Sequence, residues 1–370
     1  MCSYLDWTCS DIAKVLNYIS FHGSLDYNEI EKSTGIKNVG KLVESLRWEY
    51  RLSFSPVVWH EKLQNSLGFY SQFRLKRYIN ARILYKLGSG IFMAVLKDPL
   101  EPFTAIVGGM NIANVLGEVL ELLKEKNLVK ARWVSREVFR KQYTIDYSKF
   151  NFEKKEFDAN GIILDEPKTP IAEENLKRFT MVHFDHKDIK IVGKLQEGYS
   201  FEELPKQLNM PLSEIHNHYE HHVIGNGLLR SLLAFMGKHD FRISIFHSRN
   251  EGFERELARI ATLLITSYLE PEKDVDKDKE NITHWEAYST LITSSSALST
   301  VLDFIYTMAN KYDVNYRVYI HPIIPTDGKY IAAGSIPYEY ITDTDEWNKA
   351  KAIKDVKDNI EKFLKGELND

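Results

Sequence analysis

Four histidines stand close together in the second half of the chain, at His216, His218, His221 and His222. Two of them, His218 and His222, are four residues apart, which places both imidazoles on one face of a helix, as a metal ion requires. A carboxylate of Glu214 or Glu220 could complete that site, whereas a row of surface histidines is the simpler interpretation. Alternatively, the imidazoles become cationic together below about pH 6.5, which would make the cluster a pH sensor.

A second group of polar residues follows a predicted tight turn near the N-terminus. These residue types suit DNA, because Lys and Arg meet phosphates and Asn fits the edge of adenine. The group consists of Lys37, Asn38, Lys41, Ser45, Arg47 and Arg51. The equivalent stretch of the second half, 207–229, contains no Lys or Arg. We therefore expect the second copy to bind DNA weakly or not at all, since phosphate neutralisation supplies much of the affinity.

Glycines and an asparagine lie where a strand is predicted to turn into a helix, at Gly108, Gly109 and Asn111. A glycine turn lets backbone amides approach a ligand closely, so a small-molecule effector is expected here. No residue is predicted to be catalytic, because the sequence has no P-loop, nucleophile-elbow serine or H-E-x-x-H motif. The sequence thus predicts a protein that is not an enzyme and needs no cofactor.

The elements that position these residues occur twice along the chain. In each half, three short amphipathic helices with a tight turn before the third precede a βαββαβ series. In the first series, strands are predicted at 67–75, 91–97, 103–109 and 129–138, with helices at 76–88 and 112–126. In the second, strands are predicted at 241–247, 266–270, 284–292 and 314–321, with helices at 251–265 and 296–311. An amphipathic helix is expected over 345–368.

The fold class that follows is α+β, a tandem duplication of a winged helix-turn-helix followed by a βαββαβ ferredoxin-like ligand-sensing domain. The expected order is a winged helix-turn-helix at 1–60, a βαββαβ domain at 61–157 and a linker at 158–178. A second, degenerate helix-turn-helix at 179–235 then precedes a second βαββαβ domain at 236–342 and a C-terminal helix at 343–370.

Composition and charge agree with a globular protein of more than one domain. Of the 370 residues, 44% are hydrophobic and 27% are charged, and the net charge is -4. Residues 1–157 hold 23 Lys and Arg against 17 Asp and Glu, whereas the remainder holds 25 against 35. Any polyanion should therefore meet the first half. With no apolar run long enough for a membrane helix and no signal peptide, we expect a cytoplasmic protein without membrane contact.

This architecture resembles the Lrp/AsnC family of feast/famine transcription regulators. The residues that carry the resemblance are Asp11 to Val58 and the sequence Val107 to Asn111, where the family has a G-x-x-D turn. The second copy has Ile292 to Ser296 there, without glycine. The abundance of Lys, Glu, Ile and Tyr suits a thermophilic archaeal source.

The resemblance implies a sequence-specific regulator that binds double-stranded DNA, has RAM-like sensing domains and is modulated by a small ligand or pH. Family members pair their sheets between two chains, so a tandem chain should form an internal pseudo-dimer, with further homo-oligomers through its final helix. Two alternatives stay open. One is a siroheme-decarboxylase-like enzyme, which has the same architecture and needs His and Arg groups around a tetrapyrrole that we cannot align here. The other is a protein-interaction scaffold that does not bind DNA.

Overall fold

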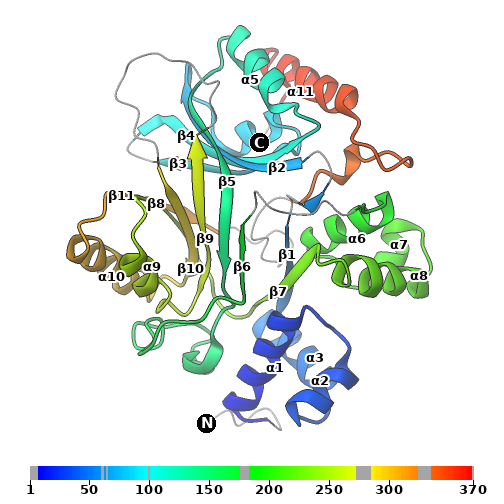
Figure 1. Cartoon of the computed structure of the whole chain (residues 1–370), viewed down its shortest axis with the longest axis vertical. Helices are drawn as coiled ribbons and strands as arrows, with labels where there is room; N and C mark the ends of the chain where they lie inside the picture. The colour runs from blue at the N-terminus through cyan, green and yellow to red at the C-terminus, as the bar shows by residue number, and fades with distance from the viewer. Residues whose placement is uncertain are drawn as a thin grey trace.

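The computed structural model describes residues 7–59, 62–63, 66–98, 101–175, 183–271, 285–323 and 335–368. Helices and antiparallel strands alternate along the chain, which makes the fold mixed α+β (Figure 1). No helix in these ranges is both long enough and apolar enough to cross a membrane.

The chain begins with three helices and a strand: α1 (Cys9–His22), α2 (Tyr27–Thr34), α3 (Val39–Tyr50) and β1 (Ser53–Val58). A capping box between Thr8 and Asp11 starts α1, and Gly23 ends it in the left-handed conformation at φ 69°. An apolar stripe forms the buried face of this helix and contains Ile12, Val15, Leu16 and Ile19.

A second three-helix unit follows in the second half, with α6 (His186–Gln196), α7 (Leu204–Leu208) and α8 (Leu212–Asn217). Its third helix changes to a π-helix, η4 (His218–Ile224), before β7 (Leu229–Phe235). Strand β1 pairs antiparallel with β7, so the two units share a two-stranded sheet. The strand after each trio of helices therefore pairs with the corresponding strand of the other half.

Both βαββαβ series are present. The first contains β2 (Ser66–Leu75), α4 (Ala81–Leu87), β3 (Phe92–Asp98), β4 (Glu101–Ile112), α5 (Leu116–Glu125) and β5 (Val129–Gln142). The second contains β8 (Phe241–His247), α9 (Glu251–Leu257), β9 (Leu263–Pro271), β10 (Ala287–Thr293), α10 (Leu298–Lys311) and β11 (Tyr316–Pro322). Several boundaries differ from the prediction: α9 ends eight residues early, α4 begins only at Ala81, and β4 continues past Gly108 and Gly109 to Ile112 where a helix was expected to begin.

All these strands belong to one nine-stranded sheet of order β11-β8-β10-β9-β5-β2-β4-β3, to which β6 (Ala172–Asn175) adds beside β5. The halves join where β5, the fourth strand of its series, pairs antiparallel with β9, the second strand of the other. The equivalent strands β11 and β3 are also in contact, and Arg317 of β11 forms an ion pair of 2.7 Å with Glu101 of β4. The fourth strand of one series therefore meets the second strand of the other at both seams, with ladder hydrogen bonds between β5 and β9.

The half-sheets face each other through a separate apolar cluster. Its members are Leu96, Ile106, Trp133, Phe246, Leu269, Tyr288 and Tyr319, with Tyr70 packed against them. Neighbours of these residues in sequence, such as Phe69 and Val107, point the other way and join the main core under the helices. Helices α5 and α11 lie at one end of the molecule, and α9 and α10 lie beside the other half-sheet (Figure 1).

The expected linker is attached to the protein over the described part, 158–175. Ile162 and Leu164 are buried, and Lys168 Nζ donates hydrogen bonds of 2.8 to 2.9 Å to the carbonyls of Thr144, Ala261 and Leu263. These carbonyls belong to both halves, so the segment holds the halves together as well as connecting them. Residues 176–178 of the predicted linker lie outside the described residues.

The final helix, α11 (Lys349–Leu364), packs on the first βαββαβ unit against α4 and α5. Its apolar stripe, including Ala352, Val356 and Ile360, is buried. Asn359 Nδ2 donates a hydrogen bond of 2.8 Å to the carbonyl of Lys86. The final helix therefore covers helices of the first βαββαβ unit.

Candidate active site

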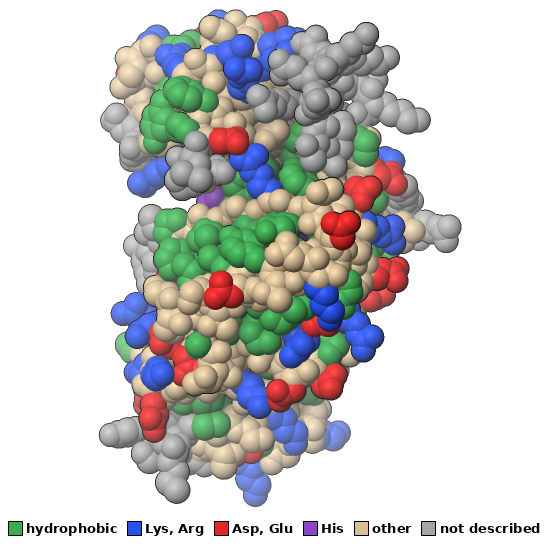
Figure 2. Space-filling view, turned by 90° about the vertical axis from the view of Figure 1, so that its left-hand side faces the viewer, with side chains coloured by type: hydrophobic (Ala, Val, Ile, Leu, Met, Phe, Trp, Pro, Cys, Tyr) green, Lys and Arg blue, Asp and Glu red, His purple; other side chains and the backbone are tan. Residues whose placement is uncertain are grey.

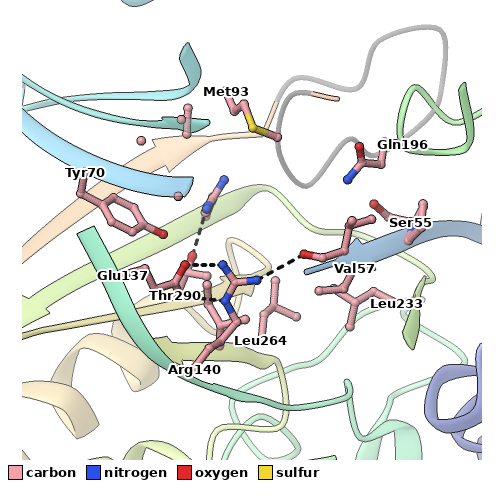
Figure 3. A pocket seen from close by; sticks show the side chains of 18 of the residues that line it. Ser55, Val57, Tyr70, Met93, Glu137, Arg140, Gln196, Leu233, Leu264 and Thr290 are labelled. Carbon is pink, nitrogen blue, oxygen red and sulfur yellow. Dashed lines mark hydrogen bonds and ion pairs between the residues drawn. The ribbon is translucent and has the colours of Figure 1, made fainter. Parts of the chain in front are cut away.

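A pocket opens in the middle of the molecule between β1, β2, the seam β5–β9 and strands β8 and β10 (Figure 3). Its cavity volume is about 160 Å³, and the empty space amounts to about 960 Å³ when the part open to solvent is included. Most of its lining is apolar, and its charged side chains are Glu137, Arg140 and Arg242. The pocket is built by both halves of the chain.

Glu137 and Arg140, both on β5, form a buried ion pair in the wall of the pocket. Arg140 Nε donates to Glu137 Oε1 over 2.7 Å, and its Nη2 donates to Glu137 Oε2. Ser267 of β9 donates a third hydrogen bond to this carboxylate. The guanidinium lies over the ring of Trp59, with 5.0 Å between its Cζ and the ring centroid, so both charges have partners despite their burial.

Arg242 supplies the second guanidinium, from β8 in the other half. Its Nε donates to Thr290 Oγ1 and its Nη2 donates to the Tyr288 hydroxyl, each over 3.0 Å. These two bonds orient the guanidinium in the wall of the pocket. With one carboxylate against two guanidiniums among the lining side chains, the pocket has an excess of positive charge and favours an anionic ligand.

Tyr70 of β2 points its hydroxyl into the same space, toward Glu137 (Figure 3). Its ring centroid lies 4.7 Å from that of Tyr288. Withdrawal of this phenol from water raises its pKa well above the usual value, and the negative charge of Glu137 adds to the shift. The Tyr70 hydroxyl therefore keeps its proton at neutral pH and is available as a proton donor.

Gly108 and Gly109, which the sequence predicts to bind an effector, line this pocket. Gly108 lies in β4, and a Cβ there would stand 3.0 Å from the Tyr70 ring. The glycine thus makes room for the tyrosine. Asn111 has a structural contact, because its Oδ1 accepts a hydrogen bond of 3.0 Å from the amide of Leu116 at the start of α5.

The structure places the residues predicted to bind DNA in different environments. Lys37, Asn38 and Lys41 are exposed at the start of α3. Arg47 and Arg51 instead line a groove against Tyr199 and Phe201 of the second three-helix unit, and Ser45 is half-buried. On the face of the molecule shown in Figure 2, acidic and basic side chains are interspersed around a hydrophobic middle.

The four histidines likewise lie in different environments. His218 is buried and lies beside His222, with ring centroids 4.9 Å apart. His216 stacks on Phe201 at 5.3 Å, and His221 is exposed. Neither carboxylate that we expected nearby joins the pair: Glu214 bonds to Lys187 instead. Asp185 and Asp188 of the α6 N-terminus take that place.

Comparison with known proteins adds a fold relationship. No protein-family model and no curated protein sequence matches the chain. The chain is similar to the crystal structure of the siroheme decarboxylase NirDL, with a TM-score of 0.50 and 11% identity, covering 96% of this chain and 99% of that one. A second structure of NirDL, in complex with an iron-uroporphyrin III analogue, matches with a TM-score of 0.46 and 12% identity, covering 89% and 96%.

This likeness contradicts the prediction that the chain is not an enzyme, because the structure that shares its fold over nearly the whole length is an enzyme. The prediction rested on missing sequence motifs, and such motifs describe only sites built from neighbouring residues. Here Tyr70, Glu137, Arg140 and Arg242 come from three strands of two half-sheets. Arg242, the one Lys, Arg, Asp or Glu in the apolar strand β8, is the signal that the sequence does offer, since a charge inside a buried strand needs a partner or a role.

Proposed function

We propose that the chain is an enzyme that decarboxylates a substrate with several carboxylates, of the siroheme type, in the central pocket. The observation that carries the proposal is the meeting of Arg242, Arg140 and the protonated Tyr70 in one largely apolar space. The shared fold with a siroheme decarboxylase supports the choice of reaction class. Because Gly108 lines this pocket, the effector site expected there is, in this proposal, part of the substrate site.

The pocket has a charged wall at Arg242 and an apolar wall, which suit a spectator carboxylate and the reacting carboxylate of the substrate, respectively. A spectator carboxylate binds Arg242, whose guanidinium is oriented by its bonds to Thr290 and Tyr288. The reacting carboxylate lies against the apolar wall near Met93 and Leu264, where loss of its charge as CO2 is favoured by the low polarity. A tight ion pair to that group would instead stabilise the ground state and slow the reaction.

The proton balance assigns a role to Tyr70. The bond between the carboxyl carbon and its neighbour breaks, CO2 leaves, and the electron pair stays on the remaining carbon. That carbon takes up one proton, so the net reaction consumes a proton and converts an acetate side chain to a methyl group. The Tyr70 hydroxyl is the proton donor within the pocket, and Glu137, toward which it points, lies on the path by which the proton is replaced.

Titration with siroheme tests the proposal directly. We expect a shift of the Soret band on binding and, on incubation, products that have lost CO2 by mass spectrometry. Arg242→Gln should weaken binding by about tenfold to a hundredfold, the usual value of a charge-assisted pair. Arg255→Gln, which alters an exposed arginine on α9, is the matched control. An unchanged Soret band in the wild type, or equal weakening in the control, contradicts the proposal.

A second function, sequence-specific binding of double-stranded DNA as a transcription regulator, is favoured by the exposed Lys37, Asn38 and Lys41. In this proposal the segments 1–60 and 179–235 are winged helix-turn-helix domains whose wings are β1 and β7. Segments 61–157 and 236–342 are the RAM-like domains of an internal pseudo-dimer. Only the first helix-turn-helix contacts DNA.

Salt-dependent binding distinguishes this second function from a scaffold that has no DNA contact. Replacing Lys37 and Lys41 by Ala should weaken binding to DNA selected from a random pool and reduce its salt dependence by about two phosphate contacts. Lys124→Ala on α5, far along the chain from α3, is the control. If the wild type binds no DNA at low salt, the regulator function is excluded and the protein-interaction scaffold remains as the alternative.

A further inference from the structure

Two histidines and two aspartates meet inside the second three-helix unit, away from the central pocket. They are Asp185, Asp188, His218 and His222, and one ligand atom of each lies within 4.8 Å of all the others. His218 Nδ1 is 2.8 Å from Asp188 Oδ1, and His222 Nδ1 is 3.3 Å from the same oxygen. His218 Nδ1 is also 3.6 Å from Asp185 Oδ2. Among the described residues, no other set of this kind converges.

The backbone of α6 fixes the orientation of both carboxylates. Asp185 Oδ1 accepts hydrogen bonds of 2.9 Å from the amides of Lys187 and Asp188. Asp188 Oδ2 accepts one of 3.1 Å from the amide of Asp185, which completes a capping box. Each carboxylate therefore has one oxygen held by the helix start, and its other oxygen is directed at the imidazoles. Such outer hydrogen bonds orient ligands in metal sites.

The helix that carries the histidines departs from α-helical geometry at this place. Residues His218–Ile224 form a π-helix, which is uncommon and often found at functional sites. The wider turn brings the His218 and His222 rings to a centroid distance of 4.9 Å at an angle of 75°. The Asp188 side chain is 1% exposed, whereas His222 is 42% exposed. An ion can therefore reach a largely buried carboxylate past one accessible imidazole.

We propose that these four side chains bind a divalent transition-metal ion of the zinc type. Two imidazole nitrogens and two carboxylate oxygens are the donor set that such ions accept in tetrahedral sites. On binding, the metal takes the place of the hydrogen bond between His218 Nδ1 and Asp188 Oδ1. Four protein ligands leave no open coordination position, which makes the site structural. It joins α6 to the π-helix and is independent of the proposed decarboxylation.

Calorimetry of the full chain with Zn²⁺, after removal of metal with a chelator, tests this site. We expect one ion per chain and a rise in melting temperature that depends on Zn²⁺ concentration. His222→Gln should lower the affinity at least about tenfold. The matched control is His221→Gln, the neighbouring exposed histidine of the same π-helix, which should bind Zn²⁺ like the wild type.

A second variant keeps the test decisive if His222→Gln perturbs folding. Asp188→Asn retains an acceptor for the capping amide of Asp185 but removes the charge, and it should also weaken Zn²⁺ binding. Co²⁺ added in place of Zn²⁺ should give visible absorption bands of a tetrahedral site in the wild type and in His221→Gln only. The proposal is overturned if the wild type binds no Zn²⁺, or if His221→Gln loses as much affinity as His222→Gln.

Discussion

Glu137 and Arg140 face each other across 2.7 Å although they are three residues apart on one strand. In a regular strand, such residues point to opposite faces of the sheet. The register of β5 against β9 shifts between Glu137 and Phe139, so Val138 forms a bulge. The extra residue turns both charged side chains to the same face. This irregularity at the seam between the halves creates the ion pair of the candidate active site.

Breaking this ion pair should be costly because both groups are buried. Arg140→Met leaves the Glu137 carboxylate without its main partner and should lower the free energy of unfolding by about 3–5 kcal/mol. Glu137→Gln combined with Arg140→Met should cost less than the sum of the single changes, since no charge is then left unpaired. Urea unfolding of the three variants measures this coupling, and strictly additive values would show that the pair does not act as a unit.

Tyr70→Phe should separate catalysis from packing. The ring and its contact with Tyr288 are kept, so the free energy of unfolding should change by less than about 1.5 kcal/mol. The rate of CO2 release should fall by about 10²–10⁴, as expected for loss of a proton donor. Tyr306→Phe on α10, an exposed tyrosine, should have no effect on the rate.

The pH dependence of the wild-type rate adds to this test. Because burial raises the pKa of Tyr70 well above its usual value, its proton is present throughout the neutral range. A decline of the rate due to Tyr70 should begin only above about pH 10, where an ordinary tyrosine titrates. A decline at lower pH that persists in Tyr70→Phe would belong to another group, and an unchanged rate in this variant would exclude Tyr70 as the donor.

The adjacent glycines of β4 should respond differently to alanine. A Cβ at Gly109 would stand 2.0 Å from the carbonyl oxygen of Ile91, which belongs to the backbone and cannot easily move. Gly109→Ala should therefore lower the free energy of unfolding by about 1–3 kcal/mol. At Gly108 the nearest atom belongs to the Tyr70 ring, so Gly108→Ala should cost less stability but more activity. If Gly108→Ala and Gly109→Ala lose activity in the same proportion to their loss of stability, Gly108 has no separate role in positioning Tyr70.

Much of the local structure could be predicted because one face of each element is buried and the other is not. The stripes in α1, α5 and α10 follow this rule. The end of α9 could not be predicted, since Leu257, Ile260, Ala261 and Leu263 are all buried. A continuous apolar run without a solvent-exposed face has no hydrophobic period that distinguishes a helix from a strand.

The candidate sites were harder to predict because they depend on contacts between distant segments. The pairing of His218 with His222 follows from helical spacing, but their partners Asp185 and Asp188 lie about thirty residues earlier, where a capping box already explains them. Arg242 and Glu137 meet only because β5 joins β9 across the halves. The bulge at Val138 has no signature in the sequence, so alternation assigns Glu137 and Arg140 to opposite faces.

His247 should make the protein sensitive to acid. Its side chain is fully buried, with Nδ1 2.9 Å from the Ser248 carbonyl and Nε2 3.1 Å from Ser289 Oγ. Those partners suit a neutral imidazole that donates through Nδ1 and accepts through Nε2. Burial lowers the pKa of His247 to about 4. The folded protein thus takes up this proton only near pH 4, whereas the unfolded chain takes it up near pH 6.5.

The sign of the effect follows from this difference in proton uptake. Between about pH 6.5 and pH 4 the unfolded chain binds more protons, so the contribution of His247 to stability is complete above pH 6.5 and is lost as the pH falls. The slope should be about 1.4 kcal/mol per pH unit for one group. His247→Gln keeps a donor and an acceptor but does not titrate, and it should flatten urea-unfolding stability across this range. His183→Gln, an exposed histidine, is the control, and equal slopes in wild type and His247→Gln would assign the acid sensitivity to other groups.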